Sequence, residues 1–549
     1  MTRWLLPAVG AAAIAAAWWQ QGSVAGALAW VIATVVAAAG VGRLVERGAR
    51  IQLQPALAVA SGLATMLVVA LVLARIGFLA WWTQVGFVIA GVGLTAVIAP
   101  SPVVIPRGSL LGVIASLIVV AIAISCLETP VVDGVNHVLA VKHLWDTGAM
   151  PSLPHAAGLA VVGEAVFSFG GGAEYAGLFD AVAAVLVIAV AVEELGTSDS
   201  DHARLVLAII ILAIVLEPAS TGGYPMALFH LGAIVALRAS TGSRVAWHAL
   251  GFALALALIR HELAYLAIPY AIAALLLHRV SRPRALVLAL VAVVVAIASV
   301  QLAAGAPPAA ALVKSIPVVL ALPVALVLAR VLGSFDIRSP FGVMCLATAT
   351  YVLALVTYAI HPAHHAGAAS FATWFAAAAA ILIAATSSLP QIHTASASLV
   401  LALLATVSLV LPLYTLRETE RLLLRFAVGL SAMRERLTSD AAAAHEQVRA
   451  AQLQLPAGSA IAFWGRSAAR LDFERNAIRD VSATDGRFLV PIETDRLAGL
   501  DYLVVEDLAV TPRRKRKEPP IYVPALSNVS DRITLERSSG VVRVFRVKN

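Results

Sequence analysis

Long apolar segments separated by short polar breaks make up most of the chain, from the N-terminus to about Leu416. A helix needs about 20 apolar residues to cross the hydrocarbon core of a bilayer, and most of these segments approach that length. The pattern therefore predicts a polytopic α-helical membrane protein with about 13–15 spans. The predicted spans are 4–19, 22–42, 55–77, 80–100, 109–128, 174–194, 204–217, 226–240, 245–259, 262–278, 284–304, 312–330, 341–360, 371–386 and 394–414.

The pattern changes after Leu416. Residues 417–454 carry apolar side chains at helical spacing with charges between them, which predicts an amphipathic juxtamembrane helix. Farther on, AIAFWG and DYLVVED are short apolar runs and SGVVRVFRV alternates with period two, so all three read as strands. With a helix expected at ARLDFERNAI, residues 455–549 are predicted to form a small α/β domain, which also carries a basic loop at 513–517.

Basic residues predict the orientation of the spans. With an odd number of spans, the breaks rich in arginine all fall on one side, which the positive-inside rule makes cytoplasmic. The N-terminus is then cytoplasmic, and the opposite face receives the 129–173 loop and an extracytoplasmic C-terminal domain. We expect a multi-pass protein of the bacterial cytoplasmic membrane. The arginines are Arg43, Arg47, Arg50, Arg107, Arg204, Arg238, Arg244, Arg279, Arg282, Arg284, Arg330 and Arg338.

Composition supports the membrane interpretation. Of the 549 residues, 60% are hydrophobic and only 13% are charged, against roughly 25% charged in soluble domains. The net charge of +8 fits topology and contact with lipid phosphates, and nucleic acid is not an expected partner. Cys126 and Cys345 both lie in predicted spans, which argues against a disulfide framework or a thiolate metal site.

The longest polar break, between Cys126 and Ala173, concentrates ionisable residues where a membrane face begins. Asp133 follows a span that ends at Pro130 and opens an amphipathic stretch, which residues 148–154 end, beginning with Gly148. A second short helix, about 156–169, is apolar enough to lie in the interface. Apolar surroundings would therefore partly cover the Asp133 carboxylate. Such a group can act as a general base for a substrate hydroxyl, although a helix N-cap is the alternative role. The ionisable residues of the break are Glu128, Asp133, His137, Lys142, His143, His155 and Glu164.

Two further carboxylates compete for the catalytic role. Glu128 stands at the end of the same span and is either the active carboxylate or an interfacial charge. Glu217 ends a later span before a Gly-Gly-Tyr-Pro turn and is either a second acidic group or a helix-end carboxylate. The predicted catalytic residues are therefore Asp133, Glu128 and Glu217.

Cationic and imidazole groups on the same predicted face are candidates for binding a phosphate or a substrate. Arg260 can grip a phosphate with its planar fork, or pair internally with Glu262. Lys314 contacts either a lipid phosphate or a diphosphate. The spacing in HPAHH suits a metal pair, but Pro362 favours a loop, so substrate hydrogen bonding and interface polarity stay open. The candidates are Arg260, His261, Glu262, Lys314, His137, His155, His361, His364 and His365.

The overall layout resembles the GT-C superfamily of membrane glycosyltransferases. The matching features are Asp133-Gly134-Val135-Asn136-His137, residues 144–148, the 154–172 segment, and the tail with PAGSAIAFWG, LDFERNAI and LDYLVVEDL. The resemblance divides the chain into added N-terminal transmembrane helices (1–108), a GT-C-like core (109–416), the juxtamembrane helix (417–454) and the extracytoplasmic α/β domain (455–549).

The resemblance implies inverting transfer of a sugar from a polyprenyl-phosphate donor to a lipid, glycan or protein acceptor. By position the base is Asp133, with Gly134 standing where the family often has a second acidic residue. Arg260, Lys314 or His261 would bind the donor phosphate, and membrane lipids are further partners. No cofactor is specified, and a divalent metal stays open.

Three other functions fit parts of the pattern. A transporter or lipid flippase should show repeats and charges near mid-membrane, whereas the ionisable residues here gather at span ends. A polysaccharide polymerase or ligase usually has a late, basic active loop, whereas the large loop here follows the fifth span. A non-catalytic assembly or sensor protein would use the C-terminal domain for binding.

Overall fold

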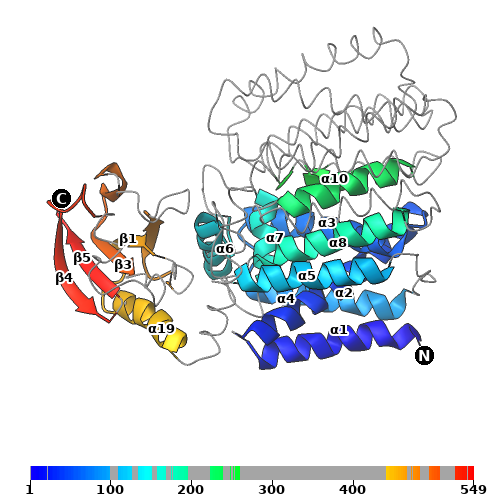
Figure 1. The fold of residues 1–549 in the computed structure, drawn as a ribbon, viewed down its shortest axis with the longest axis horizontal. Helices are drawn as coiled ribbons and strands as arrows, with labels where there is room; N and C mark the ends of the chain where they lie inside the picture. The colour runs from blue at the N-terminus through cyan, green and yellow to red at the C-terminus, as the bar shows by residue number, and fades with distance from the viewer. Residues whose placement is uncertain are drawn as a thin grey trace, which may run out of the picture.

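The computed structural model shows a mostly helical chain with a small C-terminal sheet (Figure 1). It describes residues 2–21, 23–98, 109–126, 134–150, 158–168, 175, 177–195, 223–238, 248, 251–252, 254–256, 258–259, 440–465, 471–472, 474–481, 492, 494–506, 526–540 and 542–548.

Within the described residues, seven long helices form a bundle, and Figure 1 shows them lying side by side. Each coincides with a predicted apolar segment, so the helical prediction is confirmed for this part of the chain. The polar break after the fifth helix holds two shorter helices, α6 (Gly134–Thr147) and α7 (Gly158–Ser168), as the pattern predicted. The seven are α1 (Thr2–Trp19), α2 (Val24–Ala49), α3 (Pro55–Arg75), α4 (Trp81–Val97), α5 (Ser109–Cys126), α8 (Leu178–Leu195) and α10 (Gly223–Arg238).

Two of the described helices are long and apolar enough to cross a bilayer, at Ala25–Ala49 and Pro55–Arg75. Two shorter apolar helices, Trp4–Trp19 and Trp81–Val97, flank them. The length and apolar composition of these helices suit a membrane span.

Successive helices run in opposite directions and define two ends of the bundle. The loop end carries the turn 76–80 and the residues after α6, 148–150. The arginine end carries Arg43, Arg47 and Arg50. At the arginine end, both carboxylate oxygens of Glu193 lie 3.0 Å from the Ala56 backbone N–H. The last turn of α8 thus supplies a cap for the first turn of α3, where backbone donors lack helical partners.

Glycines let α2 approach its neighbours closely. A Cβ on Gly62 of α3 would lie 1.8 Å from the Ala38 carbonyl oxygen of α2, and one on Gly42 would lie 1.9 Å from the Ala58 carbonyl oxygen. Likewise, a Cβ on Gly40 would meet the Gly91 carbonyl oxygen of α4 at 2.0 Å. Small residues that bring backbones together are typical of helix pairs inside membranes.

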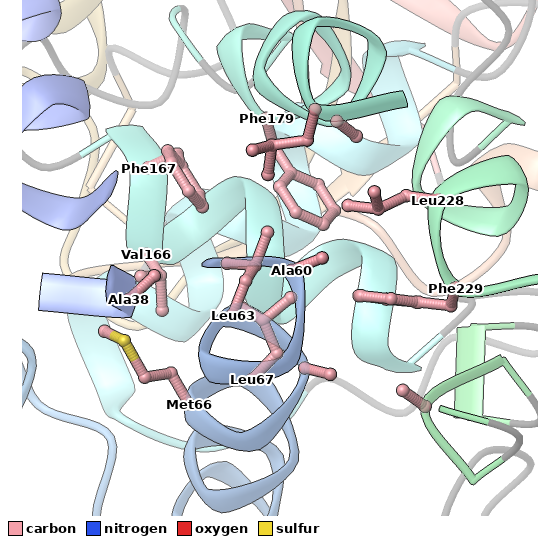
Figure 2. Packing of buried hydrophobic residues seen from close by; sticks show 14 of the residues in the cluster. Ala38, Ala60, Leu63, Met66, Leu67, Val166, Phe167, Phe179, Leu228 and Phe229 are labelled. Atoms are coloured by element: carbon pink, nitrogen blue, oxygen red, sulfur yellow. The ribbon is translucent and has the colours of Figure 1, made fainter. Parts of the chain in front are cut away.

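The core of the bundle forms around α3, with side chains from α2, α7, α8 and α10 packed on it (Figure 2). Leu63 and Leu67 are fully buried at the centre of this cluster. Phe167 of α7 stacks on Phe179 of α8, with ring centroids 5.4 Å apart. α7, which belongs to the polar break, is therefore part of the main core and not a loose surface helix.

The C-terminal domain is a five-stranded sheet in the order β2-β1-β3-β5-β4. β1 pairs in parallel with β2 and β3, and the β3–β5 and β5–β4 pairs are antiparallel. The three predicted strand segments are confirmed as β1, β3 and β5. The strands are β1 (Ala460–Trp464), β2 (Ala477–Asp480), β3 (Tyr502–Glu506), β4 (Ile533–Ser539) and β5 (Val542–Val547).

Both faces of the central strands are covered. α19 (Asp440–Leu453) lays Val448 and Ala451 against Phe463 and Val504 on one face. Residues 492–500 and 526–529 cover the other. Burial on both sides explains why β1 and β3 are continuous apolar runs instead of alternating ones. α19 includes the last part of the predicted 417–454 helix, and this part packs on the sheet.

The ends of α19 and β2 are tied together by side-chain hydrogen bonds. The Gln452 amide accepts from the Asp472 N–H and donates to the Asp472 carbonyl oxygen, both at 2.7 Å. The helix predicted at ARLDFERNAI is wrong for the residues that the structure describes. Residues 471–472 and 474–476 form a bend and a turn, and Ala477 and Ile478 already belong to β2.

Candidate functional site

The candidate site is the 129–173 segment, here called the outer loop after its predicted position. It carries the predicted base, and its described parts include α6 and α7. α6 begins at Gly134, the residue directly after Asp133. It packs against α7, which in turn packs on α2, α3 and α8. The helix that follows the predicted base is therefore held through α7 by the body of the bundle.

Two tryptophan indoles hold the C-terminal end of α7. Trp30 of α2, only 1% exposed, donates from Nε1 to the Val166 carbonyl oxygen at 2.6 Å. Trp145 of α6 donates to the neighbouring Ala165 carbonyl oxygen at 3.2 Å. Both carbonyls belong to the last turn of α7, where no helical N–H remains to bond them. The two indoles thus satisfy buried acceptors and join α2, α6 and α7 at one point.

Replacing Trp30 with Phe tests this connection. Phe keeps a large aromatic ring but leaves the Val166 carbonyl oxygen without its indole donor, at an expected cost of about 1–3 kcal/mol. We expect a lower midpoint of thermal unfolding for the purified protein in detergent. Trp82→Phe is the matched control, because Trp82 is exposed and lies outside the core. Equal midpoints for the two variants would contradict the proposed role of the indole.

The end of α6 is fastened to the turn between α3 and α4. Gly148 ends α6 in a left-handed conformation, with φ of +69°. The Leu79 N–H donates to the Gly148 carbonyl oxygen, and the Met150 N–H donates to the Ala74 carbonyl oxygen, both at 3.1 Å. These backbone hydrogen bonds hold the C-terminal end of α6 against the turn between α3 and α4.

We call α6, α7 and the hydrogen bonds that hold them to the bundle the frame. Ionisable side chains of α6 and α7 are partly or fully buried within it. Lys142 and Asp146 form an ion pair of 2.5 Å on one face of α6. Burial lowers the pKa of the neighbouring His143 below its usual value, and the negative charge of Asp146 partly opposes that shift. Glu164 of α7 is 1% exposed and engages in an interaction with a neighbouring group. α6 and α7 therefore carry an imidazole of lowered pKa, an ion pair and a buried glutamate side chain.

The C-terminal domain contacts this frame. The edge strand β2 lies against α6, and Figure 1 shows α6 at the end of the bundle that faces the sheet. α6 therefore contacts both the helical bundle, through α7, and the C-terminal domain, through β2.

Of the predicted site residues, the structure describes only the backbone of His137, in the first turns of α6. It gives no geometry that joins these candidates. Within the described ranges, no three His, Cys, Asp or Glu side chains form a group that could hold a metal ion. The candidates outside the described residues are Asp133, Glu128, Glu217, Arg260, His261, Glu262, Lys314, His155, His361, His364 and His365.

Three residues near the outer loop were missed by the sequence patterns. Trp30 carries no local signal, because a tryptophan in an apolar segment is equally consistent with simple packing. The apolar face of the amphipathic stretch includes Trp145, but this pattern does not show its hydrogen bond to α7. Arg75 did carry a signal: it ends a predicted span on the face opposite the arginine-rich breaks, against the positive-inside rule.

No protein-family model matches the chain, and no curated protein matches it in sequence. Its function is therefore inferred from its own residues and their arrangement.

Proposed function

We propose that the protein is a polytopic glycosyltransferase of the bacterial cytoplasmic membrane. It transfers a sugar from a polyprenyl-phosphate donor to an extracytoplasmic acceptor, with inversion, and Asp133 is the general base. The supporting observation is the frame around α6: the helix that begins directly after Asp133 is held by indole and backbone hydrogen bonds to the bundle. A catalytic carboxylate must be positioned within about half an ångström, and such a support meets that need.

The exposed surface of the bundle supports a membrane location. On α5, Val113, Ile114, Leu117 and Ile118 share one face and are all exposed, while Ala115 is buried on the other side. An apolar helix face of this kind is costly in water and favourable in lipid. Exposed tryptophans stand near the helix ends, where they suit the interface between lipid and water; they are Trp4, Trp18, Trp19, Trp81 and Trp82.

We assign the arginine end of the bundle to the cytoplasm and the loop end to the outer face. Single cysteines in a Cys126→Ser, Cys345→Ser background test this. Gly48→Cys lies at the exposed arginine end, and Glu536→Cys lies on the exposed β4. We expect a membrane-impermeant maleimide to label Glu536→Cys in right-side-out vesicles and Gly48→Cys only in inverted ones. Labelling of both positions from the same side would overturn this topology.

The proposed reaction is a single displacement at the anomeric carbon. Asp133 accepts the proton of the acceptor hydroxyl as its oxygen attacks from the face opposite the phosphate. The bond from the anomeric carbon to the phosphate oxygen breaks, and its electron pair stays on the polyprenyl phosphate. Arg260, Lys314 or His261 would stabilise that developing negative charge.

The test is transfer of label from a panel of polyprenyl-phosphate sugars in membranes that contain the protein. We expect turnover with one donor class, which would also identify the sugar. Movement of the intact lipid across vesicles without sugar transfer would instead support a flippase.

A further inference from the structure

The loop end of the bundle carries a rim of exposed aromatic side chains next to an arginine. Trp18 lies in the last turn of α1, Trp81 and Trp82 begin α4, and Phe78 lies in the turn between α3 and α4. Each is about half exposed. The rings of Trp18 and Trp81 lie 6.3 Å apart, which joins the α1 and α4 parts of the surface. We call these four residues and Arg75, the last residue of α3, the aromatic rim.

The side chain of Arg75 is not needed to cap the C-terminal end of α3. The Gly77 and Met150 N–H groups both donate to the Ala74 carbonyl oxygen, and the Phe78 N–H donates to the Leu73 carbonyl oxygen. A basic residue at a helix C-terminus commonly bonds these last carbonyls. Here backbone donors already bond them, so capping does not account for the guanidinium.

The guanidinium of Arg75 has unused capacity. Its Nε is buried and has no hydrogen-bond partner within the described part of the chain. A buried donor without a partner costs free energy, which an anionic acceptor would recover. The planar fork of arginine fits the oxygens of a phosphate.

An apolar stripe on α3 leads to this arginine. Val69, Val72 and Ile76 are exposed and follow each other at spacings of three and four residues, so they share one face of the helix. The stripe spans about 10 Å along the helix axis. Arg75 stands beside Ile76 at the edge of this face, where the stripe meets the rim.

We propose that the aromatic rim docks a membrane lipid that bears a phosphate. Its chain lies along Val69, Val72 and Ile76, its phosphate bonds Arg75, and the indoles of the rim lie at the level of the headgroup. A free phosphate would use the arginine and leave the stripe exposed, whereas this lipid matches both features. The turn that carries Phe78 is hydrogen-bonded to Gly148 and Met150, so the docked phosphate lies beside the outer loop.

The identity of this lipid as the polyprenyl-phosphate donor rests on the proposed function, but the docking site does not. The rim belongs to residues 1–108, the part of the chain that the GT-C resemblance leaves unassigned. It would hold the lipid on the added helices before the sugar reaches the loop.

Binding of radiolabelled farnesyl phosphate to the full-length chain in dodecyl maltoside micelles, which contain no phosphate, tests the proposal. We expect Arg75→Gln to weaken binding by about tenfold or more, because a charge-assisted phosphate contact is lost. Arg47→Gln is the matched control: it removes the same charge from an exposed position at the arginine end and should leave binding unchanged. Inorganic phosphate and farnesol should each compete poorly, since each supplies only half of the ligand.

Several results would overturn the proposal. The first is that the wild type does not bind farnesyl phosphate, or binds it no more tightly than Arg75→Gln does. The second is that Arg47→Gln weakens binding as much as Arg75→Gln. The third is full competition by inorganic phosphate, which would indicate a free-phosphate site. If Arg75→Gln lowers the thermal unfolding midpoint, Trp82→Leu is the variant to test instead, because it keeps the charge of Arg75 and removes an exposed ring of the rim. Unchanged farnesyl phosphate binding in Trp82→Leu would then reject the aromatic rim as the docking site. Rim-dependent binding without sugar transfer from any donor would refute the transferase and leave the docking site standing.

Discussion

Replacing Asp133 with Asn is expected to reduce sugar transfer by about 10²–10⁴-fold, the range typical for loss of a general base. The amide keeps the size of the carboxylate but cannot accept a proton from the acceptor hydroxyl. Donor binding should change little, so the loss should appear in the turnover number. The measurement is initial rate of label transfer in membranes with equal amounts of each variant.

This substitution also separates catalysis from helix capping. Asp133 precedes Gly134, the first residue of α6, and Asp and Asn are about equally good N-cap residues. Asp133→Asn should therefore leave the thermal unfolding midpoint unchanged, whereas Asp133→Ala would lose both roles if Asp133 also caps α6. Loss of activity with normal stability in the Asn variant would assign the function to the carboxylate itself.

Asp146→Asn is the matched control within the same loop. Asp146 pairs with Lys142 on α6, and a partly exposed pair of this kind contributes about 0–1 kcal/mol. We expect its activity to stay near that of the wild type. Full activity in Asp133→Asn would contradict the assignment and direct attention to Glu128→Gln and Glu217→Gln. Loss of transfer in Asp146→Asn as well would indicate that any disturbance of α6 stops the enzyme.

Local patterns in the sequence were sufficient to predict the elements around the outer loop. Apolar spacing predicted α6 and α7, and the Gly148 signal predicted where α6 ends, because a glycine can adopt the left-handed conformation of a helix terminus. In the C-terminal domain, AIAFWG and DYLVVED predicted β1 and β3, since short apolar runs fit strands that are buried on both faces.

The contacts that hold the loop could not be predicted in the same way. Trp30 and Val166 are 136 positions apart, and Ala56 and Glu193 are 137 apart. Periodicity shows which face of a helix is apolar but not which helix covers it, so such pairings follow only from the packed bundle. The catalytic candidates rest on the chemistry of Asp133, Glu128 and Glu217 and stay predictions.

Replacing Gly62 with Ala is expected to destabilise the bundle by about 3 kcal/mol, at the upper end of the usual cost of overpacking. The added Cβ would lie 1.8 Å from the Ala38 carbonyl oxygen and 2.5 Å from the Gly42 backbone nitrogen. Both neighbours are backbone atoms, which cannot rotate away as a side chain would. α2 and α3 must therefore separate, and the close contact along their crossing is lost.

Gly93→Ala is the matched control, because a Cβ at this position of α4 meets nothing within 4 Å. There the change removes only the conformational freedom of glycine, and it should stabilise the helix by about 0.5–1 kcal/mol. The two variants make the same chemical change and should shift the thermal unfolding midpoint in opposite directions.

Trp30 of α2 donates to the Val166 carbonyl oxygen, and the Ala74 carbonyl oxygen of α3 accepts from the Met150 N–H. A displaced α2–α3 pair would therefore separate these two supports of the loop. Gly62→Ala should therefore also reduce sugar transfer, while Gly93→Ala should retain it; destabilisation by both would show that the fold tolerates no added methyl group and that the α2–α3 contact has no special role.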